Sequence, residues 1–276
     1  MHQQITSLQN KHIKNVVKLR QRHHRDAQQL MLVEGVRESR RALESRLIPS
    51  MAFICPPLLN GEGEQATAVL RNLSQNQNIP TLEVTPVVYA KIAVRGESGG
   101  LLLTLPYLQR SLTDLAGASF LVIIEGGEKP GNLGAILRTA DAAGVDGVII
   151  AEGETGGTDV NNPNVVRASL GALFTLPVVS VPSPEAINWL RRQQIRIIAA
   201  TPDANRTYTA VNLTQPVALA MGSEALGLSP EWLAESDEKV LIPMFGVVDS
   251  LNLSVATAVL LYEVVRQRNA QTKATT

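Results

Sequence analysis

The sequence predicts an α/β protein, with a mostly parallel sheet in the C-terminal part and a smaller α/β unit before it. Short runs rich in Val, Ile and Leu alternate with amphipathic segments along most of the chain. In the second half these runs are apolar on both faces, as in parallel sheets that helices cover on both sides. The alternation is interrupted over residues 106–118, which we expect to be a linker. We therefore expect two domains, at 1–105 and 119–276.

The first part opens with a basic helix over residues 10–28, in which Ile13, Val16 and Val17 form a short apolar stripe. Strand-like and helix-like segments then alternate. The expected strands are 30–33, 51–54, 81–84 and 101–105, and the expected helices are 36–46, 65–73 and 87–92.

The second part repeats the alternation with longer elements. Its expected strands are 120–125, 147–150, 176–181, 196–200, 217–221 and 239–242, and its expected helices are 132–143, 165–172, 185–193 and 252–268. The last helix is apolar almost all round, so it needs burial on more than one side and suggests a subunit interface. Residues 271–276 are expected to be a frayed tail.

Composition excludes several classes of protein. The apolar content of 45% and charged content of 18% are those of an ordinary globular chain. No apolar run is long enough to span a membrane, and the N-terminus lacks the apolar core of a signal peptide. A single cysteine, Cys55, excludes an internal disulfide and a cysteine-rich metal site. We therefore expect a cytoplasmic protein without a membrane partner.

Charge and histidine are unevenly distributed. Residues 1–46 carry ten Lys and Arg against four Asp and Glu, although the whole chain is neutral. This basic arm indicates either a nucleic-acid contact or a solvated helix, and charge alone favours neither. All four histidines lie in the first 24 residues. A catalytic centre farther along has no imidazole unless the N-terminal segment folds back, which argues against most Ser-His-Asp, Cys-His and zinc-hydrolase mechanisms.

The first notable segment is a glycine-rich turn between the strand that ends at Glu125 and the helix from Asn132 that contains Arg138. Such a turn presents backbone N–H groups to an anion. It lacks the spacing of a P-loop, because Asn132 follows Gly131, and of the Gly-x-Gly-x-x-Gly fingerprint. It is therefore either an anion site or only a tight connection. Arg138, among apolar neighbours, is either packed by its stem or directed at an anionic ligand.

Two further segments follow strands near the end of the chain. Glu224 lies between Gly222 and Gly227 directly after a buried strand, where ligands of open α/β sheets bind. Ser250 and Asn252 stand at the start of the last helix, in the run Ser-Leu-Asn-Leu-Ser. Taken singly, each segment reads equally well as a turn followed by a capped helix.

Together, in this order and at these separations, the three segments resemble the motifs of the SpoU (TrmH) family of RNA ribose methyltransferases. The matching residues are 132–140, 221–227 and 242–256. Residues 5–14 and 32–37 are similar to the family's accessory domain, which is similar to small ribosomal proteins that bind RNA. The sequence departs from the pattern of that accessory domain at residues 95–100, where many members of the family carry Gln-Gly.

The resemblance implies a catalytic domain with a deep trefoil knot, S-adenosylmethionine as methyl donor and a ribose 2′-hydroxyl of RNA as acceptor. It implies that the catalytic residues are Arg138, Asn132, Glu224, Ser250 and Asn252. It also implies a donor pocket made of Met221, Gly222, Ile242, Met244, Leu251 and Ser254. No metal is expected, because the sulfonium already makes the methyl group electrophilic.

By family analogy Arg138 activates the nucleophile. Because arginine stays protonated, we expect a clamp on the adjacent phosphate that also stabilises developing alkoxide charge, rather than a simple base. The accessory domain favours ribosomal RNA over tRNA, and the family implies a homodimer through the C-terminal domain. We expect phosphate contacts from basic residues of the N-terminal part: Lys14, Lys18, Arg20, Arg22, Arg25 and Arg37.

Three other functions stay open at this point. A catalytically silent RNA-binding protein of the same fold is the first, although all five expected catalytic residues are present. A dinucleotide-dependent oxidoreductase is the second, and the missing Gly-x-Gly-x-x-Gly counts against it. A methyltransferase for small molecules is the third, and the basic N-terminal part counts against that one.

Overall fold

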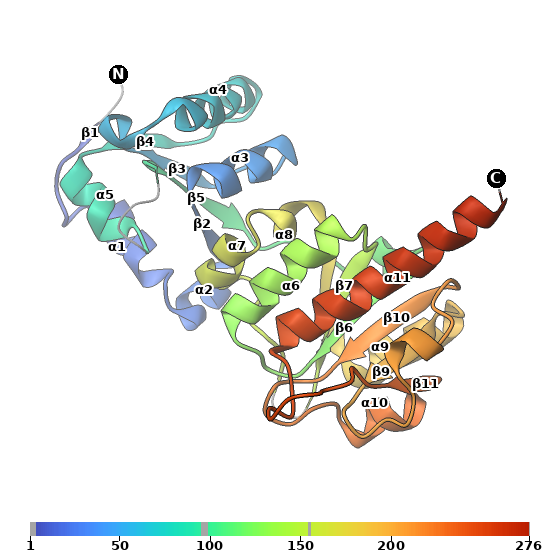
Figure 1. The fold of residues 1–276 in the computed structure, drawn as a ribbon. Helices are drawn as coiled ribbons and strands as arrows, with labels where there is room; N and C mark the ends of the chain where they lie inside the picture. The colour runs from blue at the N-terminus through green and yellow to red at the C-terminus, as the bar shows by residue number, and fades with distance from the viewer. Residues whose placement is uncertain (1–3, 95–98, 154–155, 276) are drawn as a thin grey trace. The chain divides into compact units, whose positions relative to one another are not determined.

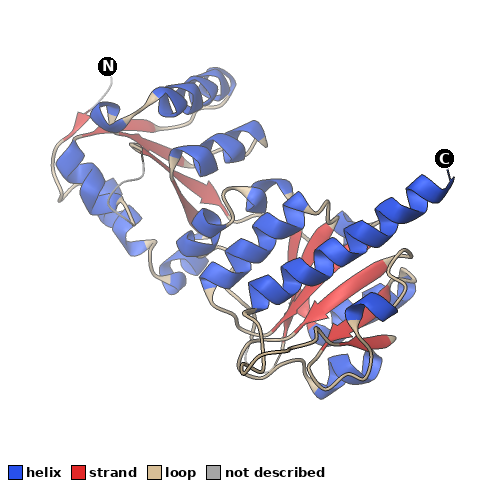
Figure 2. Cartoon of the chain, viewed as in Figure 1, coloured by secondary structure: helices blue, strands red, loops and turns tan. Residues whose placement is uncertain are grey.

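The computed structural model describes residues 4–94, 99–153 and 156–275 of the chain (Figure 1). The chain forms two compact units: Met1–Gln109 with Asp159–Thr175, and Arg110–Thr158 with Leu176–Thr276. Helices and strands alternate in both, so the predicted α/β class is confirmed (Figure 2). The division at 1–105, 106–118 and 119–276 stays a prediction, as does the trefoil knot. The departure expected at 95–100 lies largely outside the described residues.

The first unit contains a five-stranded mixed sheet of order β1-β4-β3-β5-β2. Strands β1, β4 and β3 are parallel, and β5 runs antiparallel to both β3 and β2. Its core contains Leu32, Phe53, Val84 and Leu102, all fully buried. The strands are β1 (Gln4–Ile5), β2 (Leu30–Glu34), β3 (Met51–Ile54), β4 (Thr81–Val84) and β5 (Leu101–Pro106). The helices are α1 (Lys11–Lys18), α2 (Arg22–Gln28), α3 (Val36–Glu44), α4 (Gly61–Asn76), α5 (Pro86–Ile92), α7 (Pro163–Ala168) and α8 (Ala172–Thr175), with the 3-10 turn η1 (Pro56–Leu58).

The prediction of a single helix over residues 10–28 is wrong, because the helix is interrupted between α1 and α2. Gln21 has an extended backbone, with φ −94° and ψ 133°. The carbonyls of Leu19 and Arg20 accept hydrogen bonds from the Arg25 guanidinium at 3.1 and 2.9 Å instead of from helical N–H groups. The side chain of Arg25, which is itself paired with Asp159, thus replaces the helical hydrogen bonds at the break.

The second unit contains a six-stranded sheet of order β11-β9-β10-β6-β7-β8, parallel throughout. The strands are β6 (Phe120–Glu125), β7 (Gly147–Glu152), β8 (Val178–Pro182), β9 (Arg196–Ala200), β10 (Val217–Met221) and β11 (Glu238–Val240). The helices are α6 (Pro130–Ala142), α9 (Ser183–Arg192), α10 (Pro230–Glu235) and α11 (Leu253–Thr275), with the 3-10 turns η2 (Leu112–Leu115) and η3 (Tyr208–Ala210).

Helices cover both faces of this sheet, as the apolar strands predict (Figure 1). Leu121 and Ile123 of β6 share a core cluster with Leu190 of α9 and Trp232 of α10. The alternate residues of β6 point to the opposite face, where α6 and α11 lie side by side. None of the described helices is long and apolar enough to cross a membrane.

Other differences from the expected elements have local causes. The helix expected over 165–172 is split into α7 and α8, because Leu170 and Gly171 adopt left-handed φ values of 51° and 88°. The frayed tail expected over 271–276 is helical as far as Thr275, since no Gly or Pro interrupts α11. Helix α10 and strand β1 are too short for a periodic signal, and the sequence did not predict them.

Candidate functional site

The three polar segments singled out in the sequence meet at one edge of the second unit's sheet. Strands β6, β10 and β11 are parallel, so their C-terminal ends lie at the same edge. Asn132 follows β6, Glu224 follows β10, and Asn252 precedes α11 in the segment that follows β11. The topology therefore brings together residues that are up to 120 positions apart.

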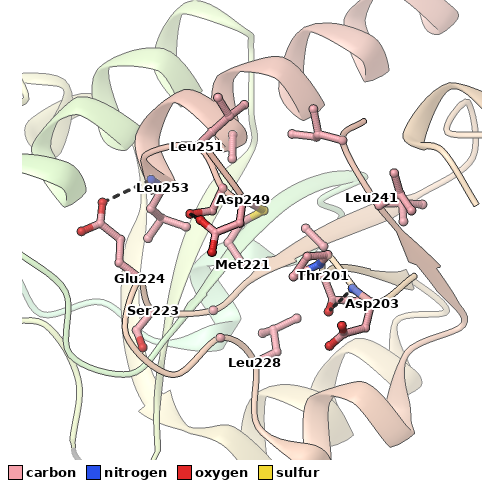
Figure 3. A pocket seen from close by; sticks show the side chains of 18 of the residues that line it. Thr201, Asp203, Met221, Ser223, Glu224, Leu228, Leu241, Asp249, Leu251 and Leu253 are labelled. Carbon is pink, nitrogen blue, oxygen red and sulfur yellow. Dashed lines mark hydrogen bonds between the residues drawn. The ribbon is translucent and has the colours of Figure 1, made fainter. Parts of the chain in front are cut away.

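Asn132, Glu224 and Asn252 form a closed hydrogen-bond network. Glu224 Oε1 accepts from Asn132 Nδ2 at 3.0 Å and from Asn252 Nδ2 at 2.6 Å. Asn252 Nδ2 also donates to Asn132 Oδ1 at 3.1 Å. The Leu253 backbone N–H donates to Glu224 Oε1 at 3.4 Å, drawn as a dashed line in Figure 3. Each of the three side chains is thus oriented by the other two.

The carboxylate of Glu224 is held in its ionised form. Lys129 Nζ lies 2.8 Å from Glu224 Oε2. The hydrogen bond from Lys129 is the main cause of the lowered pKa of Glu224, followed by the bond from the Leu253 N–H and, further down, that from Asn132. The same pairing raises the pKa of Lys129. Glu224 therefore acts as a hydrogen-bond acceptor and is poorly suited to be a proton donor at neutral pH.

The loop after β10 leaves no room for a side chain at Gly222. A Cβ there would lie 2.0 Å from the Gly227 carbonyl carbon and 2.1 Å from the Leu228 nitrogen. Gly227 itself has a φ of +68°, which favours glycine. Buried Glu125 fixes the end of the loop, since its Oε2 accepts the Ser229 N–H at 2.7 Å. These contacts fold the loop tightly against the strand ends.

A cavity of about 790 Å³ opens beside this network (Figure 3). This size suits a small-molecule site, for which about 300–1,000 Å³ is usual. Polar and apolar groups contribute almost equally to its lining, and the polar side chains come from three segments: 201–203, 223–224 and 249–252. Of the expected donor-pocket residues the cavity includes Met221, Gly222, Ile242, Met244 and Leu251, and of the expected catalytic residues it includes Glu224, Ser250 and Asn252.

The lining fits the adenosine part of S-adenosylmethionine. Among the described residues, the backbone N–H groups of Ile242, Met244 and Leu251 have no hydrogen-bond partner, although all three residues are half-buried. Half-buried N–H groups that other parts of the chain do not satisfy are available to the ring nitrogens and hydroxyls of a nucleoside. Apolar Leu228 and Leu253 lie in the same cavity and suit a flat ring (Figure 3).

Ser254 does not line the cavity, so its expected place in the donor pocket is not supported. Its hydroxyl donates to Asn252 Oδ1 at 2.6 Å, and its backbone N–H donates to the same atom at 3.1 Å. Ser254 thus fixes the oxygen of the amide whose nitrogen binds Glu224.

Arg138 stands apart from the cavity of its own chain. It is exposed on α6, whose Leu133, Ile136 and Leu137 are buried. With the residues that the structure describes, Arg138 makes no hydrogen bond or ion pair. Its guanidinium is therefore free for an anionic partner from outside this chain.

Other residues of the site were not expected from the sequence. Thr201, Asp203 and Asp249 line the cavity, and Glu128 and Lys129 hold the network. Thr201 follows β9 directly, so the rule that ligands bind beyond the C-terminal ends of strands could have indicated it. Lys129 gave no such signal, because its partner Glu224 is 95 residues away.

The basic residues expected to contact RNA differ in their availability. Lys14, Lys18, Arg22 and Arg37 are exposed. Arg20 is exposed too, but its guanidinium donates to the backbone carbonyls of Lys91 and Ala93 at 2.7 and 2.5 Å.

The expectation that Arg25 contacts RNA is wrong. Arg25 is only 1% exposed and forms an ion pair with Asp159 of the same unit. Burying a guanidinium requires such a partner, so this arginine serves the fold.

Two family profiles match the chain. Residues 119–262 match the SpoU rRNA Methylase family, and residues 10–102 match the MRM3-like substrate binding domain. The chain is also 39% identical over 161 residues to a 23S rRNA (uridine(2479)-2'-O)-methyltransferase of Streptomyces viridochromogenes. That alignment covers 56% of this chain and 55% of the relative, so the chain spans about half of that protein.

Two solved structures are similar over nearly the whole chain. A crystal structure of an RNA 2'-O ribose methyltransferase has a TM-score of 0.82 and 39% identity, with 96% of this chain and 99% of that chain covered. The structure of an AdoMet-bound rRNA methyltransferase from Sinorhizobium meliloti has a TM-score of 0.85 and 29% identity, with 96% and 97% covered.

Proposed function

The chain belongs to the SpoU rRNA methylase family, and from this we propose that it transfers a methyl group from S-adenosylmethionine to a ribose 2′-hydroxyl of RNA. The observation that carries the proposal is the closed network of Asn132, Glu224 and Asn252 at the rim of a nucleoside-sized cavity. An oxidoreductase that uses a dinucleotide is not supported, because the turn after β6 lacks the required glycine spacing.

The cavity is the proposed donor site. When bound, S-adenosylmethionine supplies an electrophilic methyl group on a positively charged sulfur. The N–H groups of Ile242, Met244 and Leu251 bind the nucleoside, and the apolar side chains of the lining pack against its ring. The solved structure of the AdoMet-bound relative from Sinorhizobium meliloti supports this donor.

The polar rim positions the acceptor. Ser250 and Asn252 line the cavity beside Glu224, so a ribose at the rim meets hydroxyl, amide and carboxylate groups. Holding the 2′-hydroxyl in line with the methyl group is the main requirement of such a transfer, because the donor is already activated.

Arg138 is the proposed clamp on the RNA. It is exposed and has no partner among the residues that the structure describes, which suits a contact to the phosphate next to the target ribose. From that position its fixed positive charge stabilises the alkoxide that develops on the 2′-oxygen. Arg138 does not accept the proton of the 2′-hydroxyl, because a guanidinium stays protonated.

Ribosomal RNA is the proposed substrate class. The Streptomyces relative is named as a 23S rRNA 2′-O-methyltransferase, and the N-terminal part matches a substrate-binding domain. The exposed residues Lys14, Lys18, Arg22 and Arg37 supply phosphate contacts there. Action on ribosomal RNA agrees with the proposed cytoplasmic location.

A homodimer through the second unit is also proposed. Six large apolar side chains of this unit are exposed, on the loops after β10 and β11 and on α11. They are Leu226, Phe245, Val247, Val248, Val255 and Tyr262. A second copy that covers these side chains would remove them from water, which supports an interface in this unit.

The first experiment is methyl transfer from tritiated S-adenosylmethionine to separate pools of unmodified ribosomal RNA and tRNA, followed by digestion to nucleosides. Label in 2′-O-methylated nucleosides of the ribosomal pool supports the proposal, and label in the tRNA pool alone overturns the substrate class. If no RNA is labelled and calorimetry detects no donor binding, the RNA-binding function without catalysis replaces it.

A further inference from the structure

The carboxylate of Glu128 contacts both segments that carry the network. Its Oε1 accepts from Asn132 Nδ2 at 3.0 Å and from the Lys129 N–H at 2.7 Å, and its Oε2 accepts the Glu224 backbone N–H at 3.2 Å. The Glu128 N–H itself donates to Thr158 Oγ1 at 2.8 Å, and Thr158 is buried. Glu128 is thus a fixed acceptor that joins the turn before α6 to the loop after β10.

Glu128 and Glu224 together determine how the Asn132 amide is turned. The amide nitrogen has two hydrogens, and the two carboxylate oxygens that accept them both lie 3.0 Å from Nδ2. The amide oxygen is left facing Asn252 Nδ2 at 3.1 Å. If Glu128 no longer accepts, one hydrogen loses its partner and the amide can rotate.

Lys129 balances the charge of this arrangement. Two carboxylates on one amide repel each other unless a cation lies near. Lys129 Nζ pairs with Glu224 Oε2 at 2.8 Å, and the negative charge of Glu128 also acts on this ammonium group. Lys129 is 77% exposed, so it reaches Glu224 from the solvent side and holds it in the ionised form.

We propose that Glu128 and Lys129 are positioning residues of the methyl-transfer site: Glu128 fixes the orientation of the Asn132 amide, and Lys129 keeps Glu224 an acceptor only. This inference rests on the proposed function. Both residues act through Asn132 and Glu224, and neither lines the donor cavity. Their loss therefore changes turnover and its pH dependence and leaves donor affinity unchanged.

Glu128→Gln tests whether Glu128 fixes the orientation of the Asn132 amide. The amide keeps the size of the carboxylate but replaces one acceptor oxygen with an NH2 donor, and every partner of Glu128 is itself a donor. We expect kcat to fall about ten- to a hundredfold, the range for a lost hydrogen bond to a charged group. The Kd for S-adenosylmethionine stays at its wild-type value, and circular dichroism shows that the variant is folded. Glu231→Gln, at an exposed site in the same unit, is the matched control.

Lys129→Met and Lys129→Arg test whether Lys129 keeps Glu224 an acceptor only. The groups that face Glu224 are Glu128 and Lys129 from the turn, Asn132 from α6, and the Asn252 amide and Leu253 N–H at the start of α11. Without the ammonium group the pKa of Glu224 rises toward its ordinary value, so activity is lost at a higher pH as the medium is acidified. In the pH profile of kcat/KM, we expect the fall in activity on the acid side to occur at higher pH in Lys129→Met. In Lys129→Arg we expect it to occur at the wild-type pH. An unchanged pH profile in Lys129→Met contradicts the proposal, whatever the change in stability.

The outcomes separate this inference from the proposed function. If the wild-type protein labels RNA and Glu128→Gln is equally active, only the positioning role is overturned. If the wild-type protein labels no RNA, side-chain amide NMR of Asn132 decides, with Asn132→Asp used to assign its pair of resonances. A shift of that pair in Glu128→Gln supports the positioning role, and an unchanged pair overturns it.

Discussion

Replacing Gly222 with alanine places a methyl group where the fold has no room. The new Cβ lies 2.0 Å from the Gly227 carbonyl carbon, 2.1 Å from the Leu228 nitrogen and 2.3 Å from the Gly227 oxygen. All three atoms belong to the backbone, so no flexible side chain can give way. Ordinary contacts of a Cβ begin at 3.4 Å. The loop after β10 therefore has to move by about 1 Å or more.

Two effects of different size follow from this displacement. Overpacking of a tight site costs about 1–3 kcal/mol of unfolding free energy, which lowers Tm by roughly 2–12 °C for a unit of this length. The displaced loop also carries Glu224 and lines the donor cavity. A shift of about 1 Å in a catalytic site can lower the rate by around a hundredfold. We therefore expect function to suffer far more than stability.

Thermal unfolding monitored by circular dichroism measures the loss of stability, and calorimetric titration with S-adenosylmethionine reports the displacement of the loop, because the loop lines the donor cavity. Gly131→Ala is the matched control, since nothing lies within 4 Å of its Cβ and its φ is not positive. We expect weak or undetectable donor binding in a folded Gly222→Ala protein and wild-type binding in the control. Wild-type donor affinity in Gly222→Ala would refute the close packing argued for this loop.

Four further predictions concern other parts of the molecule. Arg138→Ala should lose on the order of a hundredfold in turnover while calorimetry shows unchanged donor binding, and near-wild-type turnover would remove Arg138 from the mechanism. Asp159→Ala leaves the guanidinium of Arg25 buried without its ion pair, so urea unfolding should show a loss of about 3–5 kcal/mol; a loss below about 1 kcal/mol, the range of an exposed pair, would contradict its structural role. RNA affinity should fall steeply with salt, and Lys14→Ala should reduce the slope of log K against log salt by about one, whereas an unchanged slope would exclude Lys14 as a phosphate contact. Methyl transfer should be unaffected by EDTA in a buffer without added metal, and inhibition that added Mg²⁺ or Zn²⁺ reverses would show that a metal takes part.

Much of the fold follows from local patterns in the chain. The strands 51–54, 81–84, 120–125, 196–200 and 217–221 were predicted with the bounds that the structure gives them. In these segments the apolar run ends at a residue that cannot continue the strand or that begins a turn, so the boundary is itself a local property. Boundaries failed where a distant residue takes part, as between α1 and α2. There Arg25 replaces the helical hydrogen bonds while its guanidinium pairs with Asp159, 134 positions away.

The candidate site divides in the same way. The places after strands and at a helix start indicated the three segments, and the family resemblance implied Asn132, Glu224 and Asn252 within them. The structure joins these three residues in one network. Their catalytic role stays a prediction. Glu128 and Lys129 were not recognised, because a Glu-Lys pair before a helix gives no signal of its own.

What the sequence determined by itself is the order of strands and helices, the class of fold and the three segments that carry the site, since each depends on residues that are near one another in the chain. Only the tertiary structure decided which of those residues meet. It placed Glu224 between Lys129, Asn132 and Asn252, set Arg138 and Ser254 outside the cavity, and buried Arg25 against Asp159. The physical reason is that a parallel sheet brings the C-terminal ends of distant strands to one edge, and the contacts made there depend on strand order.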